Sequence, residues 1–186
     1  IGTHESRGLK RGVVVDIEST VQSIQRAVEE AELMAGCEIR SVYASISGNH
    51  IQCRNSQGIA PIRDGEVTYA DLDRVLEAAK AVAVPADQKI LHAIPRDYVL
   101  DDSQEGIRNP VGMSGVRLEV RAHLVTGALS AAANISKCVN RCGLQVDDLI
   151  LSAIASSTAV LTPDEKELGV VLVDIGAGTT DIAVFV

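Results

Sequence analysis

The segment Asp174–Asp181, which reads DIGAGTTD, contains the residues best suited to chemistry. Gly176 and Gly178 can adopt positive φ and leave no Cβ between the backbone and a ligand. Successive backbone N–H groups in such a turn form a concave set of donors for phosphate oxygens, and the hydroxyls of Thr179 and Thr180 can add to it. The segment therefore predicts a phosphate-binding turn.

The two acidic residues of this segment bear on the ligand. Asp174 and Asp181 would repel a polyphosphate unless a cation lay between them, so the pair predicts Mg²⁺, held by Asp174 through water. A tight hairpin that uses glycine only for its turn is the alternative. The predicted binding residues are Asp174, Gly176, Ala177, Gly178, Thr179, Thr180 and Asp181.

The residues around the turn decide which kind of phosphate motif it is. A dinucleotide-binding motif leads into a helix, and a P-loop needs Gly-Lys-Ser/Thr. Here the β-branched run IAVFV follows the turn, so we expect a hairpin between strands at 169–173 and 182–186. Such a hairpin is similar to the phosphate hairpins of the actin, Hsp70 and sugar-kinase group.

No other group of residues predicts catalysis or metal binding. Cys138 and Cys142 lie one helical turn apart, too close for a usual disulfide, and no histidine stands at a ligand spacing from a cysteine. We expect free thiols in a reducing cytosol. Ser156 and Ser157 have no obvious base beside them in the sequence.

Composition excludes some partners. The 186 residues are 46% hydrophobic with a single Phe and no Trp, so the core must be built from Ala, Val, Leu and Ile. A net charge of −8 argues against nucleic acid as the main partner, because phosphate-backbone binding needs clustered Lys and Arg. No apolar run reaches the length of a membrane span, and no signal peptide opens the chain.

The helices are marked by their caps and apolar spacing. We expect a helix over 13–36, with Asp16 as its cap and Gly36 as its end, a second after Thr68 with Asp71 in the capping-box position, and a third over 128–142. A short strand within 144–151 should lead into further helical segments, up to 169.

The strands should surround the second helix. We expect them at 39–47, over 50–62 with a turn around Asn55–Gly58, and over 89–101 with a break at Pro95. A Gly/Pro loop over 105–115 precedes a strand over 116–124, whose strict alternation indicates one buried and one wet face. The alternation of strands and helices predicts an α/β protein, with a lobe at 48–125 inserted between parts at 1–47 and 126–186.

Several stretches together resemble a known family. They are 6–12, the helix ending at 26–36, and above all SVYASISGNHI (41–51), LHAIPRDYVLDDSQEGIRNPVGMSGVRLEV (91–120) and DIGAGTTDIAV (174–184). The chain is similar over essentially its whole length to FtsA, a bacterial cell-division family of the actin-like ATPase superfamily.

This resemblance implies a fold and a ligand. The flanks would be part of an actin-like (ribonuclease H-like) subdomain 1A, and 48–125 would be the α+β lobe called 1C, of SHS2 type. In the family, ATP with Mg²⁺ lies between two related halves with one phosphate hairpin from each, and hydrolysis is at best slow. The matching residues here are those of the glycine turn, with Ala177 where many relatives have a third glycine; a methyl is tolerable there if φ stays negative.

The resemblance also implies partners. The chain would be a fragment that lacks the first phosphate hairpin, the adenosine-binding half, the region that captures FtsZ and the amphipathic helix that holds the family to the membrane. It is not expected to bind ATP tightly or to be catalytic. The intact protein would tether FtsZ at the inner face of the cell membrane at the division site, and the lobe would contact neighbouring subunits and later divisome proteins.

Two other classes of protein share this scaffold. A PilM-type assembly scaffold would share the inserted lobe, and a sugar-kinase or Hsp70-type ATPase is the less favoured alternative. Within the lobe, the acidic loop at Asp101, Asp102 and Glu105 could receive a basic partner, and Arg117 and Arg121 could pair with acidic groups of a neighbour. A solvated loop and a solvated strand face are the simpler interpretations.

Overall fold

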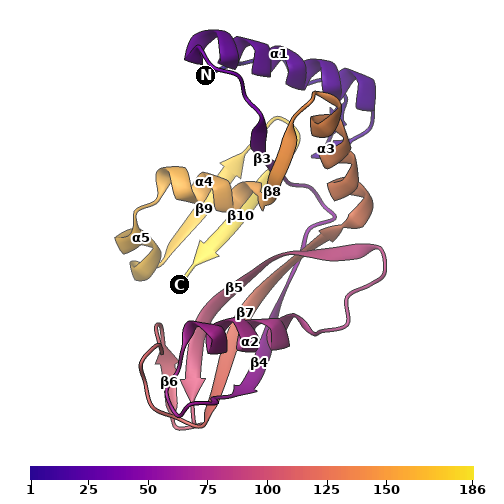
Figure 1. Ribbon diagram of the computed structural model, residues 1–186. Coiled ribbons are helices and arrows are strands. Elements are labelled where there is room, and N and C mark those ends of the chain that lie inside the picture. The colour runs from indigo at the N-terminus through magenta and orange to yellow at the C-terminus, as the bar shows by residue number, and fades with distance from the viewer. The chain divides into compact units, whose positions relative to one another are not determined.

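The computed structural model describes residues 1–186 and contains five helices and ten strands. The chain forms two compact units: unit 1 comprises Ile1–Ile51 and Ala128–Val186, and unit 2 comprises Gln52–Gly127 (Figure 1). The chain thus leaves unit 1 after residue 51 and returns to it at residue 128. The boundaries predicted from the sequence are 47–48 and 125–126, a few residues earlier in each case. Each unit has its own hydrophobic core.

Unit 1 contains ten elements. They are β1 (Leu9–Lys10), β2 (Val13–Val14), α1 (Ile17–Ala35), β3 (Ser41–Ile46), α3 (Leu129–Arg141), β8 (Gln145–Leu151), α4 (Ser152–Val160), α5 (Pro163–Leu168), β9 (Val170–Ile175) and β10 (Thr180–Phe185). Unit 2 contains β4 (Gln52–Pro61), α2 (Tyr69–Lys80), β5 (Gln88–Leu100), β6 (Gln104–Ile107) and β7 (Arg117–Ala128).

Helix α1 ends as predicted and begins later than predicted. The Asp16 carboxylate accepts a hydrogen bond from the Ser19 amide at 3.2 Å, and Gly36 closes the helix at a φ of 69°. The expected start at residue 13 is wrong, because Val13 and Val14 instead pair with Lys10 and Leu9 in the β1–β2 hairpin.

Strands β3 and β8 are parallel neighbours, so their carboxyl ends lie at the same edge. Helices α1 and α3 pack together in this unit, around a core that includes Val14, Val21 and Cys138. The Ser152 hydroxyl at the start of α4 donates to the Ile46 carbonyl at 3.2 Å. The carboxyl edge of this pair is therefore where the chain enters α4.

The β9–β10 hairpin forms a separate two-stranded sheet. Its residues alternate between half-buried and exposed, and α4 packs against the hairpin. Apart from Thr180, the exposed positions from Val170 to Ile175 and from Thr180 to Val186 are apolar: Val171, Val173, Ile175, Ile182, Val184 and Val186. The predicted antiparallel hairpin is thus confirmed, with strands slightly longer toward the turn than expected.

Unit 2 is a sheet in the order β4-β7-β5-β6, and Figure 1 shows α2 lying along it. The predicted alternation of β7 is confirmed: Leu118, Val120 and Leu124 are 0% exposed and pack in the core with Val75 of α2. Val116 is the exception at 75% exposed, since it precedes the strand.

Two predicted interruptions of strands are wrong. No turn occurs at Asn55–Gly58, because β4 runs without a break and pairs with β7 along its length. Strand β5 continues through Pro95. Its partner β6 pairs only with Tyr98 and Leu100, so Pro95 lies in a stretch of β5 with one open edge, and proline is tolerated in edge strands. Strand β6 overlaps the start of the expected Gly/Pro loop.

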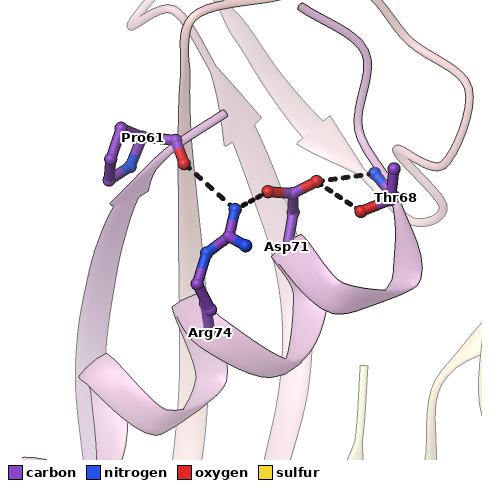
Figure 2. A network of polar contacts seen from close by, with 4 residues as sticks. All are labelled: Pro61, Thr68, Asp71 and Arg74. Carbon is purple, nitrogen blue, oxygen red and sulfur yellow. Dashed lines mark hydrogen bonds and ion pairs between the residues drawn. The ribbon is translucent and has the colours of Figure 1, made fainter. Parts of the chain in front are cut away.

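A polar network ties the start of α2 to the end of β4 (Figure 2). Asp71, only 3% exposed, accepts hydrogen bonds from the amide and hydroxyl of Thr68 at 2.9 and 2.6 Å and forms an ion pair with Arg74. Arg74 also donates to the Pro61 carbonyl at 3.3 Å. The predicted capping box is confirmed, and its buried carboxylate is paired as burial requires.

Candidate functional site

The glycine turn lies at the tip of the β9–β10 hairpin, with all seven predicted residues in or beside it. The amide of Gly176 donates to the carbonyl of Thr179 at 2.9 Å and closes the turn. Gly176, Ala177 and Gly178 are exposed. Neither of the amides of Ala177 and Gly178 has a hydrogen-bond partner. Two exposed backbone donors are thus available to an anion.

The turn does not use positive φ at either glycine. Gly176 and Gly178 could adopt positive φ, but neither does so in this turn, and Ala177 also has no positive φ. The methyl group of Ala177 therefore causes no backbone strain. What glycine contributes at 176 and 178 is the missing Cβ rather than an unusual backbone conformation.

The two carboxylates lie on neighbouring strands. Asp174 and Asp181 are directly opposite each other in the hairpin register, and both are half-buried on the side against which α4 packs. Like charges at directly opposed positions destabilise a sheet. A cation between them would remove that repulsion, which fits the predicted Mg²⁺.

Each carboxylate is held by one hydroxyl. Ser156 of α4 donates to Asp174 Oδ2 at 2.7 Å, and Thr179 donates to Asp181 Oδ2 at 3.2 Å. Ser156 was not predicted as a site residue, because nothing in the sequence indicates that α4 packs on this hairpin. The Thr179 hydroxyl is engaged with Asp181, so Thr180 is the threonine left to donate to a ligand.

These donors fit a phosphate with a hydrated cation. No group of three or more His, Cys, Asp or Glu side chains is placed to hold a metal ion, so the carboxylate pair would need water and phosphate oxygens to complete a magnesium shell. A cavity of about 460 Å³ in unit 1 is lined from elsewhere, by residues such as Val42, Ile135 and Cys138. The residues named for that cavity do not include any of the glycine turn, whose exposed amides are donors suited to phosphate.

A domain-family match and highly similar proteins both indicate similarity to FtsA. Residues 48–126 match the family described as "SHS2 domain inserted in FTSA". The whole chain is 66% identical to the "Cell division protein FtsA" of Pseudomonas aeruginosa, 55% to that of Neisseria meningitidis and 52% to that of Escherichia coli, each over 185 residues. The chain resembles FtsA over its whole length.

The similarity to FtsA covers all of the chain but only part of each relative. The chain spans 44% of the length of these FtsA proteins. In structure, it is similar to a chain of a "PilM-PilN type IV pilus biogenesis complex", with a TM-score of 0.60 and 19% identity over 97% of this chain and 48% of that one. This likeness supports a partial actin-like fold with an inserted lobe.

In the region that matches the FtsA-type SHS2 domain, the acidic loop makes contacts within unit 2. Asp101 Oδ1 accepts hydrogen bonds from the amides of Val116 and Arg117 at 2.9 and 2.8 Å, and these bonds lower the pKa of its carboxyl. Asp102 forms an ion pair with Arg117, and Glu105 forms one with Arg121 at 3.1 Å. Receiving a basic partner would therefore break existing ion pairs.

The two arginines on the wet face of β7 are likewise paired inside the domain. Arg121 also contacts Asp97 at 3.3 Å, and Arg117 contacts Glu119 at 3.7 Å. His123 on the same face bonds Asn55 of β4 at 2.9 Å. The wet face of β7 is thus internally paired, which agrees with the simpler of the two interpretations.

No helix of the chain combines the length and the hydropathy needed to cross a bilayer.

Proposed function

We propose that this chain forms part of an actin-like cell-division scaffold that binds ATP with Mg²⁺ through the turn at 174–181. The observation that carries the proposal is the pairing of Asp174 opposite Asp181 beside a turn whose Ala177 and Gly178 amides are free. The likeness to proteins named for cell division supports the biological setting. Any ATPase activity would be slow and would belong to the complete nucleotide site.

The roles of the individual residues follow from the donor set. The backbone amides at 177 and 178 and the Thr180 hydroxyl would bind phosphate oxygens, and Asp174 would hold Mg²⁺ through water, oriented by Ser156. The donors of the turn suit phosphate and a cation, so adenosine would be bound by residues outside it. Mg²⁺ would supply the charge that lets a polyphosphate lie beside two carboxylates.

In the intact protein, we propose that the scaffold tethers FtsZ at the inner face of the cell membrane at the division site. The inserted domain, 48–126, would serve contacts with neighbouring subunits and with later division proteins. Its match to the FtsA-type SHS2 domain supports this role. Contact with FtsZ and with the membrane would be made by other regions.

A substitution at Gly178 tests nucleotide binding at the turn. A Cβ there would meet only Arg11 backbone atoms at 3.5 Å and 3.6 Å, an ordinary contact, so Gly178→Ala should fold while its methyl blocks the approach of phosphate. In the full-length protein, calorimetry should show Mg·ATP affinity weakened at least about tenfold. Val184→Ala, at an exposed position of β10 outside the turn, is the control and should bind like the wild type.

Equal affinities in wild type and Gly178→Ala would show that the turn is not the phosphate site, and a wild type that binds no Mg·ATP would overturn the proposal. A PilM-type scaffold is the second candidate, favoured by the structural likeness alone. Co-sedimentation with FtsZ filaments separates the two, since only the cell-division scaffold is expected to bind them.

A further inference from the structure

The tip of the β1–β2 hairpin lies against the glycine turn within unit 1. A Cβ placed on Gly178 would be 3.5 Å from the backbone nitrogen of Arg11 and 3.6 Å from its Cα. These two segments are more than 160 residues apart in the sequence, and each is a tight turn with exposed residues. The side chain of Arg11 therefore starts beside the proposed phosphate site.

The position of Arg11 is fixed from its other side by the end of β3. A Cβ on Gly48 would be 3.1 Å from the Arg11 carbonyl oxygen, and a Cβ on Gly12 would be 2.7 Å from the Ser47 carbonyl oxygen. The tip thus packs closely against Ser47–Gly48, at the carboxyl edge of the β3–β8 pair. Ligands of open α/β sheets bind at such carboxyl edges.

The guanidinium of Arg11 has no partner in the protein. Arg11 is exposed and forms no ion pair or hydrogen bond, whereas most arginines of the chain are paired. Its φ of 51° is a left-handed conformation that favours Gly or Asn over a long side chain. An unpaired cation held at a strained turn beside a phosphate site suggests a ligand.

We infer that Arg11 is a phosphate-binding residue of this site and that it recognises the phosphate chain of the nucleotide. The inference rests on the proposed function of the turn at 174–181. A planar guanidinium can donate two parallel hydrogen bonds to a phosphate, and it offsets part of the repulsion from Asp174 and Asp181. The amides of the turn bind phosphate oxygens from one side, and Arg11 donates to them from the other.

The test compares three variants of the full-length protein by calorimetry with Mg·ATP and with adenosine. Arg11→Gly removes the guanidinium and relaxes the positive φ, so it should fold at least as well as the wild type. We expect it to weaken Mg·ATP binding about tenfold or more and to leave adenosine binding unchanged. Arg11→Lys should retain part of the affinity, and Lys10→Ala, one residue away on the same tip, should bind like the wild type.

Three results separate this inference from the proposed function. If wild type binds Mg·ATP and Arg11→Gly binds it equally well, the role of Arg11 is overturned and the turn remains the site. If Arg11→Gly weakens ATP and adenosine to the same degree, Arg11 does not act on phosphate, and the inference is again wrong. If wild type binds no Mg·ATP, both fail together.

Discussion

Asp101 shows how a single carboxylate in a turn can hold two strands together. It has a φ of 51°, and its side chain accepts hydrogen bonds from the amides of Val116 and Arg117 at the start of β7. These bonds favour the ionised carboxylate and lower its pKa below the ordinary value. Asp101 is thus a structural residue, although its sequence context also suits a binding loop.

The lowered pKa predicts the sign of a pH effect. Because the folded pKa lies below the unfolded value of about 3.9, the carboxylate stabilises the fold above about pH 4, and this contribution is lost as the pH falls through the folded pKa. Asp101→Asn keeps an acceptor oxygen but cannot ionise. Chemical denaturation at pH 3 to 7 should therefore show a shallower loss of unfolding free energy toward acid in the variant.

The control for this measurement is Ser103→Ala, because Ser103 is exposed near Asp101 and carries no ionisable side chain. Its pH profile should follow that of the wild type. Identical profiles for Asp101→Asn and wild type would show that the two amide bonds do not favour the ionised form.

At the scale of elements, Gly58 sets how closely α2 packs on β4. A Cβ at this position would lie 2.1 Å from the Val75 carbonyl oxygen and 2.4 Å from the Ala79 amide nitrogen. Both neighbours are backbone atoms of the helix, so neither can move without moving α2. Glycine in this strand therefore serves close approach between two elements.

Gly58→Ala should accordingly reverse the usual effect of this substitution. In a strand without such a neighbour, alanine would stabilise by about 0.5–1 kcal/mol through the entropy of the unfolded chain. Here the forced separation of α2 from the sheet should outweigh that gain and lower the unfolding free energy by about 2 kcal/mol or more. Thermal and urea denaturation measure it.

Gln57→Ala provides the comparison, since Gln57 is exposed on the other face of the same strand. It should change the unfolding free energy by less than about 0.5 kcal/mol. A Gly58→Ala protein as stable as Gln57→Ala would mean that α2 can shift on β4 at little cost.

At the scale of the whole molecule, the chain has two separate cores. One lies between α2 and the four-stranded sheet of unit 2 and includes Leu118, and the other lies in unit 1 and includes Cys138. Burial raises the pKa of the Cys138 thiol, and the residue is 0% exposed, so it should react with alkylating reagents only when unit 1 opens. Cys138 is therefore a reporter for unit 1.

Leu118→Ala should destabilise unit 2 by about 2–5 kcal/mol, because it leaves a cavity in a closed core. Hydrogen exchange followed by mass spectrometry should then show faster exchange in β4, β5 and β7. Exchange in α1 and α3 and the alkylation rate of Cys138 should stay unchanged. If Cys138 reacts faster in the variant, the two units unfold as one.

The sequence alone determined the parts of this protein that depend on neighbours in the chain. The caps at Asp16, Gly36 and Asp71, the alternation of β7 and the hairpin around the glycine turn all follow from local chemistry and spacing. The likeness to FtsA likewise depends on short stretches of sequence. These predictions succeed because hydrogen bonds within a turn or helix, and periodic burial, are local effects.

Only the tertiary structure decided which distant residues meet. It brought Ser156 to Asp174 and Arg11 to Gly178, and it paired the acidic loop with Arg117 and Arg121 inside unit 2. It also showed that Gly58 serves close packing rather than a turn. One residue type can satisfy several local roles, and packing between elements far apart in the chain selects among them.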